Sequence, residues 1–133
     1  MRLKQKPVLD LETVNDQIKA LFQSSTTERQ AELLMCVVKH QDVTKSQLQE
    51  LNEAYHGYDL DKLLNITTYK HEDAVCTSTK EEMEYLIKTR NNNWMKKIPS
   101  MIAFIAVGAL HLVGEDGLIT SLRKLGYTVT PVK

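Results

Sequence analysis

The sequence predicts an α/β fold, in which a small sheet ends in a βαβ unit and several helices are inserted between its first strand and its last two. Residues 102–107 form a continuous apolar run with β-branched and aromatic members, and residues 127–132 alternate between apolar and polar. Residues 116–125 have a helical pattern that stops at Gly126. If the two strands are parallel, the connection is right-handed and residues 102–107 are buried on both faces.

The other elements are predicted from local signals for helix starts and ends. Residues 7–11 are apolar and poor in helix formers, so they predict the first strand. Capping residues and apolar side chains at helical spacing predict helices over residues 14–22, 28–39 and 44–56, a short turn over residues 59–66, and a long helix from Lys80 that Pro99 ends or kinks. Residues 67–79 are polar and predict a loop. No linker or repeat divides the chain, so we expect a single domain over residues 1–133.

The composition is ordinary for a soluble globular protein, with 42% hydrophobic and 26% charged residues. The 17 Lys and Arg residues balance 17 Asp and Glu residues, so the chain offers no electrostatic basis for binding nucleic acid or an anionic membrane. The N-terminal basic residues are not followed by an apolar stretch, so no signal peptide is predicted. The longest apolar run, residues 101–107, is too short to span a bilayer as a helix.

The two cysteines carry no recognisable motif. Cys36 lies in the apolar run 33–38, and Cys76 lies in a polar stretch. Their spacing matches no metal or redox site, and a disulfide cannot be argued from sequence alone. We therefore expect buried or free thiols rather than a disulfide, with Cys36 in the core.

The segment from Gly108 to Gly117 is the strongest candidate for chemistry, because it follows the predicted buried strand and precedes a helix. Ligands in open α/β sheets bind at the carboxyl ends of strands, so His111 would present its imidazole there for metal binding or proton transfer. The glycines favour tight turns, and Asp116 is placed to cap the following helix. The alternative is a partly buried histidine that hydrogen-bonds a backbone carbonyl.

Two further candidates lie far from His111 in the sequence. Arg90 and Asn91 begin an Arg-Asn-Asn-Asn-Trp stretch inside the predicted long helix, where three asparagines are unfavourable. Arg90 could bind a carboxylate or phosphate, with Trp94 on the same helix face. Glu12 follows the first predicted strand and would meet His111 if the strands are neighbours. The alternatives are a buried Arg90 ion pair beside an aromatic core residue, and an exposed Glu12 at a helix start.

Taken together, these features resemble the TraB/PrgY/GumN family, which is related to the Tiki metalloproteases. Members are similar in having an Arg-Asn-x-x-Trp helix, an apolar strand, a Gly-x-x-His-Leu-x-Gly-x-x-Gly segment and a final Gly-Tyr-x-Val. The matching residues here are Leu11-Glu12-Thr13, Arg90-Asn91 with Trp94, residues 108–117 and residues 126–129. The resemblance covers almost the whole chain and corresponds to the C-terminal half of such a domain.

The resemblance implies a metal-dependent, peptidase-like hydrolase that acts on a peptide or protein substrate. It implies that His111 is a metal ligand or catalytic histidine and that Glu12 is an acidic ligand or base. It also implies that Arg90 and Asn91 line the site, and that a divalent Mn, Co or Zn ion activates water. For full-length members it implies the bacterial cell envelope or periplasm, which no signal in this chain indicates.

One departure from the family pattern puts this activity in question. Members have two Gly-x-x-His motifs, one in each half, whereas this sequence has only the one at residues 108–111. One histidine and one carboxylate are too few ligands for a metal site, so we expect the chain to be inactive alone, and whether it is an enzyme stays open. A homodimer, or pairing with an N-terminal half, would complete the sheet. The alternative function is a non-catalytic protein that sequesters a peptide or a haem-like ligand.

Overall fold

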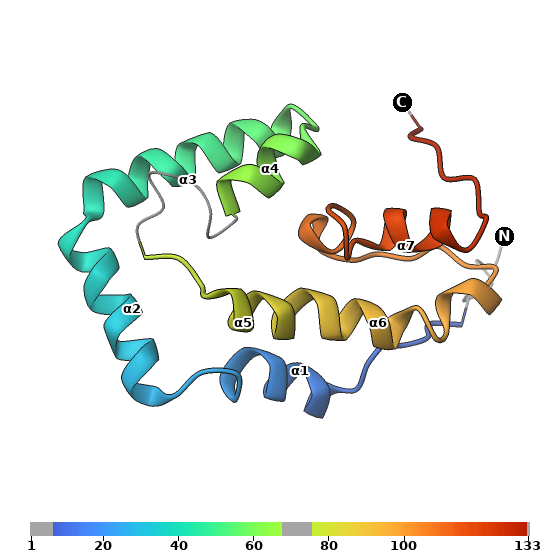
Figure 1. The fold of residues 1–133 in the computed structure, drawn as a ribbon, viewed down its shortest axis with the longest axis horizontal. Coiled ribbons are helices and arrows are strands. Elements are labelled where there is room, and N and C mark those ends of the chain that lie inside the picture. The colour runs from blue at the N-terminus through green and yellow to red at the C-terminus, as the bar shows by residue number, and fades with distance from the viewer. Residues whose placement is uncertain (1–6, 68–75, 133) are drawn as a thin grey trace, which may run out of the picture.

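The computed structural model describes residues 7–67 and 76–132, which form helices joined by irregular segments (Figure 1). The elements are α1 (Val14–Phe22), α2 (Thr27–Lys39), α3 (Gln41–His56), α4 (Leu60–Thr67), α5 (Lys80–Met83), the π-helical η1 (Glu84–Thr89), α6 (Arg90–Trp94), the 3-10 turns η2 (Ile98–Ser100) and η3 (Ala109–His111), and α7 (Leu118–Lys124). Helices α5, η1 and α6 continue one another as a central rod, with α1 on one side and α7 on the other. Helices α2, α3 and α4 form an arc in which α2 lies beyond the α5 end and α3 and α4 run back above α5.

The prediction of an α/β fold with a βαβ unit is wrong, because no described residue lies in a strand. The predicted strand segments 7–11 and 127–132 are free of helix, but no backbone ladder joins them to each other or to residues 102–107 among the described residues. The run 102–107 is also not buried on both faces, since Phe104 is 95% exposed. An extended segment becomes a strand only when another segment offers its N–H and C=O groups beside it. Here the run packs against residues of helices instead.

The predicted helices are confirmed, with small shifts at their ends. Thr13 begins α1 through a reciprocal capping box with Asp16, and Thr79 begins α5 through the same arrangement with Glu82. Each box satisfies backbone N–H groups that a helix start otherwise leaves unpaired. Of the predicted loop between α4 and α5, residues 68–75 lie outside the described part of the chain.

The interior of the long helix differs from an ideal α-helix. Six residues, Glu84–Thr89, adopt π-helical backbone directly before Arg90. Such wide turns are rare and occur frequently at functional sites. Helix α6 ends at Trp94, and Pro99 lies in the 3-10 turn η2 beyond it, so the proline follows the helix end and does not kink the helix.

A small core lies between α6, η2 and α7. Trp94, Ile98 and Leu118 are buried there, and partly buried side chains that include Ile105 and Val107 pack around them. The chain exposes 10677 Å² in total, whereas a folded monomer of its 15.2 kDa is expected to expose about 7100 Å². Much apolar surface therefore remains uncovered.

The two cysteines form a disulfide, so the expectation of free thiols is wrong. Cys36 on α2 is bonded to Cys76, with a Cα–Cα distance of 5.5 Å. Arg29 of α2 reaches the same region, because its Nε lies 3.1 Å from Glu82 Oε1 and its Nη2 donates to the carbonyl of Thr77 at 3.2 Å. Together these contacts connect the α2–α3–α4 arc to the start of the central rod.

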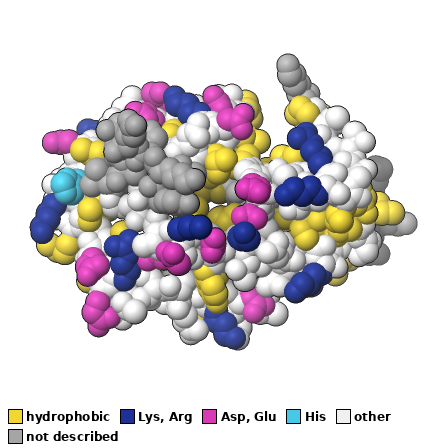
Figure 2. Space-filling view, viewed as in Figure 1, with side chains coloured by type: hydrophobic (Ala, Val, Ile, Leu, Met, Phe, Trp, Pro, Cys, Tyr) yellow, Lys and Arg dark blue, Asp and Glu magenta, His cyan; other side chains and the backbone are white. Residues whose placement is uncertain are grey.

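The surface matches the zero net charge of the sequence. Figure 2 shows Lys and Arg side chains interspersed with Asp and Glu side chains over one face, and hydrophobic side chains gathered mainly in its right half. In residues 7–67 and 76–132 no helix has both the length and the apolar character that crossing a membrane requires.

Candidate functional site

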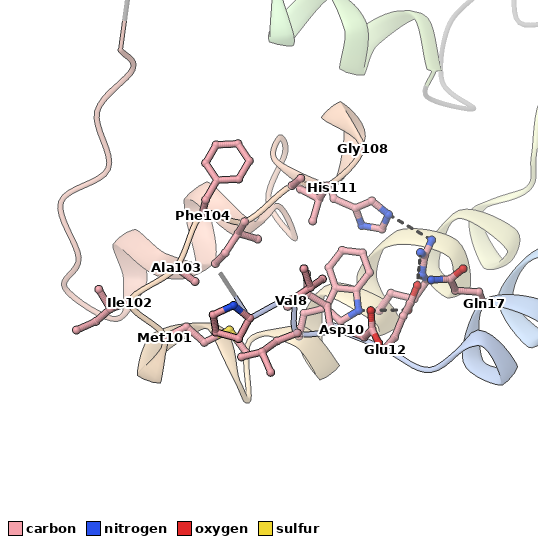
Figure 3. Close-up of a pocket in the computed structure, with 18 residues that line it drawn as sticks. Val8, Asp10, Glu12, Gln17, Met101, Ile102, Ala103, Phe104, Gly108 and His111 are labelled. Carbon is pink, nitrogen blue, oxygen red and sulfur yellow. Dashed lines mark hydrogen bonds and ion pairs between the residues drawn. The ribbon is translucent and has the colours of Figure 1, made fainter. Parts of the chain in front are cut away.

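A groove of about 1190 Å³ lies between two irregular segments and the central helix (Figure 3). Residues 7–12 and 101–108 form its walls, which carry mostly apolar side chains. Arg90, Trp94 and His111 line its inner end. The groove is therefore apolar along its length and polar at one end.

Glu12 and Arg90 form a two-point ion pair at the polar end. Arg90 Nη2 lies 2.6 Å from Glu12 Oε1, and Arg90 Nε donates to Glu12 Oε2 at 3.1 Å. Trp94 Nε1 donates to the same Oε2 at 3.2 Å, so the carboxylate accepts three hydrogen bonds. The Glu12 side chain is only 10% exposed. The ion pair that the sequence allowed as an alternative role for Arg90 is therefore present. The other alternative, in which Glu12 is an exposed residue at the start of α1, is wrong.

Local structure holds the two partners in place. Glu12 directly precedes Thr13, whose capping box fixes the backbone at the start of α1. The carbonyl of Leu11 accepts a hydrogen bond from Lys97 Nζ at 3.0 Å. On the helix side, Arg90 Nη1 donates to the carbonyl of Leu86 at 3.3 Å, within the π-helical segment. The guanidinium is therefore oriented by its own helix as well as by Glu12.

Asn91 connects the helix to the loop that carries His111. Its side chain is completely buried, and its Nδ2 donates to the carbonyls of His111 at 3.1 Å and Asp116 at 2.8 Å. Its Oδ1 lies 2.8 Å from His111 Nδ1. Asparagine has a low helix propensity, but at position 91 its side-chain amide makes three hydrogen bonds that hold the His111 loop against the helix.

The contacts of Asn91 fix the tautomer of His111. Both amide hydrogens of Asn91 point at carbonyls, so its Oδ1 accepts and His111 Nδ1 carries the proton. The lone pair of Nε2 then faces Arg90 Nη1 at 3.3 Å. The His111 ring also lies 4.4 Å from the Trp94 ring, centroid to centroid. Burial, and secondarily the Arg90 charge, lower the pKa of His111 to about 4, with Glu12 opposing the shift. His111 is therefore a neutral imidazole at physiological pH.

The Gly-x-x-His spacing corresponds to one 3-10 turn, in which the His111 N–H donates to the carbonyl of Gly108 at 3.0 Å. The loop needs glycine further on: Gly114 has φ of +84°, and a Cβ at Gly117 would lie 2.4 Å from the Val113 carbonyl oxygen. Residue 116 does not cap α7 as predicted, because residue 117 is the N-cap.

The metal expected from the resemblance does not fit this arrangement. His111 Nε2 and both Glu12 oxygens contact Arg90, so a divalent ion between them would face the guanidinium charge. No three His, Cys, Asp or Glu side chains gather into a metal-binding group within residues 7–67 and 76–132. Two donors are also too few for a protein metal site.

All four candidate residues nevertheless meet at one place, although Glu12 lies 78 residues from Arg90 in sequence. Sequence reasoning placed Trp94 on the same face as Arg90, which is confirmed, since the Arg90 guanidinium carbon lies 5.0 Å from the Trp94 ring centroid. It missed the role of Trp94 as a donor to Glu12. This role could have been predicted in part, because a buried indole N–H usually donates to a hydrogen-bond acceptor.

We expect the neutral state of His111 to make stability depend on pH. The pKa of His111 is lowered from 6.5 to about 4 in the folded chain, so between these values the unfolded chain binds the extra proton. The free energy of unfolding should therefore fall by about 1 to 3 kcal/mol as pH decreases from 6.5 to 4. Urea unfolding at several pH values measures this slope, and His111→Gln should flatten it. An equal slope in both proteins would contradict the assignment.

Comparison with known proteins gives one match. The sequence profile described as the TraB/PrgY/gumN family matches residues 1–131, which is nearly the whole chain. No curated protein and no solved structure gives a match.

Proposed function

Because the chain belongs to the TraB/PrgY/gumN family, we propose that it carries part of a peptidase-like hydrolase site at the inner end of its groove. The observation that supports this most is the meeting of Glu12, Arg90 and His111, which come from distant parts of the sequence. A carboxylate, a guanidinium and a neutral imidazole at the polar end of an apolar groove are groups that hydrolytic sites use. The proposed substrate is a peptide or protein, since the apolar walls suit the side chains of an extended chain.

In this proposal the chain does not hydrolyse peptides alone. Arg90 contacts the lone pair of His111 Nε2 and both carboxylate oxygens of Glu12, so an attacking water would have to compete with the guanidinium for either group. A histidine with a pKa of about 4 is also a weak general base near neutral pH. The sequence holds one Gly-x-x-His motif, and further groups from another segment or chain are part of the proposal. The Mn²⁺, Co²⁺ or Zn²⁺ ion that the resemblance implies belongs only to such a completed site.

Peptide binding without hydrolysis is the measurable consequence. A labelled, uncharged ten-residue peptide rich in Val, Ala and Leu should bind the full chain saturably in a fluorescence anisotropy titration. Met101→Glu, in the groove wall, should weaken this binding at least tenfold, while Met35→Glu on α2 should leave it unchanged. A quenched fluorescent version of the peptide should show no cleavage by the chain.

Two outcomes would overturn the proposal. Absence of peptide binding would mean that the groove is not a substrate-binding site. Cleavage of the peptide by the chain alone would mean that the site needs no further groups. Isothermal titration with Mn²⁺, Co²⁺ and Zn²⁺ adds a third check. Tight binding of one ion that His111→Ala abolishes would contradict the argument that Arg90 blocks the donors.

A second candidate is a non-catalytic protein that binds a peptide or a haem-like ligand. It is favoured by the hydrogen bonds that Glu12 and His111 already make within the chain, because these contacts occupy both ring nitrogens of His111 and both carboxylate oxygens of Glu12 beside an apolar groove. Titration with haemin, followed by the change in its absorption spectrum, tests the haem-binding form of this candidate, because both candidates predict peptide binding without cleavage. A saturable 1:1 complex together with no peptide binding would favour this second function.

A further inference from the structure

Residues 101–107 form an apolar segment with one face that is covered in part, since Ala103 on that face is exposed, and one face that is bare. Ile105 and Val107 are partly buried against the Trp94 cluster. Ile102 and Phe104, at alternate positions, are 107% and 95% exposed, and Figure 3 shows them on the segment that forms one wall of the groove. A period of two between inward and outward side chains is the pattern of a strand that lies on a core with its other face uncovered.

Within residues 7–67 and 76–132, the backbone of this segment is unpaired as well. No N–H or C=O group of residues 102–107 makes a hydrogen bond to another described residue. Exposed edges in folded proteins normally carry charged residues or proline, which prevent pairing with another chain. Residues 100–110 contain neither. The segment therefore combines uncovered apolar side chains with backbone groups that pair with no described residue. The exposed apolar side chains of α2 and α3 differ, because the backbone there is hydrogen-bonded within the helices.

We propose that a second copy of this chain pairs with residues 102–106 as an antiparallel β-strand across a two-fold axis. Pairing centred on Phe104 places the two Phe104 rings opposite each other and each Ile102 opposite Ala106 of the other copy. Aromatic pairs across strands are favourable, and a small residue beside a β-branched one avoids crowding. Because the segment has no charge, two identical copies approach without repulsion. Such a self-complementary contact closes as a dimer.

The chain as a whole has surface to spare for such a contact. It exposes 10677 Å², about 3600 Å² more than a compact monomer of this mass, while a stable interface takes about 800 Å² from each partner. Val8 and Leu9, which are 90% and 71% exposed, lie on the opposite wall of the same groove and extend the apolar surface. The dimer does not depend on the proposed hydrolase-related function. If both hold, the second copy lies against the wall of the groove that leads to His111.

Sedimentation velocity of the full chain tests the dimer. From about 1 to 100 μM the chain should shift from one to two copies. Phe104→Lys should weaken this association at least tenfold, because it puts two positive charges opposite each other across the axis. Leu48→Lys changes a side chain that is 64% exposed on α3 and serves as the matched control, with unchanged association expected.

Hydrogen–deuterium exchange tests whether backbone pairing forms the contact. Amide exchange in residues 102–106 should slow as concentration rises in the unmodified chain and should stay fast in Phe104→Lys. A chain that remains monomeric at 100 μM would overturn the proposal, as would open-ended aggregation in place of a two-copy species. Equal weakening by Leu48→Lys would also overturn it. Protection of these amides by an added peptide, without dimerisation, would instead assign the edge to a peptide partner.

Discussion

Replacing Arg90 with methionine is expected to lower the free energy of unfolding by about 3 to 5 kcal/mol, one of the two largest effects we expect. The substitution keeps an unbranched apolar side chain in place of the arginine stem but leaves the Glu12 carboxylate, which is 10% exposed, without its charge partner. Trp94 Nε1 would be its one remaining donor of the three. Urea unfolding followed by circular dichroism measures the change.

A double substitution separates charge from packing in this result. Glu12→Gln with Arg90→Met removes both charges and should recover at least half of the lost stability, because no uncompensated buried charge remains. If the double variant is as unstable as Arg90→Met alone, the guanidinium stabilises the fold through its other contacts. Those contacts are with the Leu86 carbonyl, His111 and the Trp94 ring.

Removing the disulfide should cost a similar amount, about 4 kcal/mol, as expected for a cross-link that closes a loop of this length. The bond joins Cys36 to Cys76 across a separation of 40 residues and holds the α2–α3–α4 arc against the start of α5. Cys36→Ser with Cys76→Ser should therefore lower the urea midpoint substantially. Among the described residues, the ion pair of Arg29 with Glu82 also connects the arc to the rod, and it would remain in this variant.

Chemical reduction provides the control for this second prediction. The unmodified chain in excess dithiothreitol should match the double serine variant, and the variant itself should not respond to the reductant. Similar midpoints for oxidised and reduced unmodified chain would mean that the bond does not constrain the unfolded state. Before unfolding, mass spectrometry should show that the unmodified chain has lost two hydrogens, which means that the disulfide is formed.

Local sequence signals predicted the helices well because helix starts are local events. The capping boxes at Thr13 and Thr79 are each complete within four residues, so their bounds follow from the sequence. The strands failed for the opposite reason. Residues 102–107 do avoid the helix, and their inward and outward alternation is strand-like, but whether a neighbouring segment completes the ladder depends on the rest of the fold. A disulfide is likewise a long-range contact that spacing does not encode.

The site was partly predictable. The four-residue spacing of Arg90 and Trp94 placed them on one face, and the asparagines inside the helix indicated a special role there. The sequence predicts that Glu12 and His111 lie close together because they follow neighbouring strands, but these strands do not form. The two residues lie close together because both contact Arg90 on the central helix. The tautomer of His111 could not be predicted, since it depends on which carbonyls the Asn91 amide reaches.

The π-helical segment has a consequence for how this chain tolerates change. A π-helical turn holds one more residue than an α-helical turn. The segment Glu84–Thr89 therefore affects the direction in which the side chains of α6 point around the helix axis. Deletion of a single residue within this segment would let the wide turn close into ordinary α-helix, with Arg90, Asn91 and Trp94 at nearly the same azimuth about the axis. The same deletion in the α-helical residues Lys80–Met83 would rotate these three side chains together by roughly a quarter turn, so the π-helical segment is expected to tolerate the loss of one residue better than α5 does.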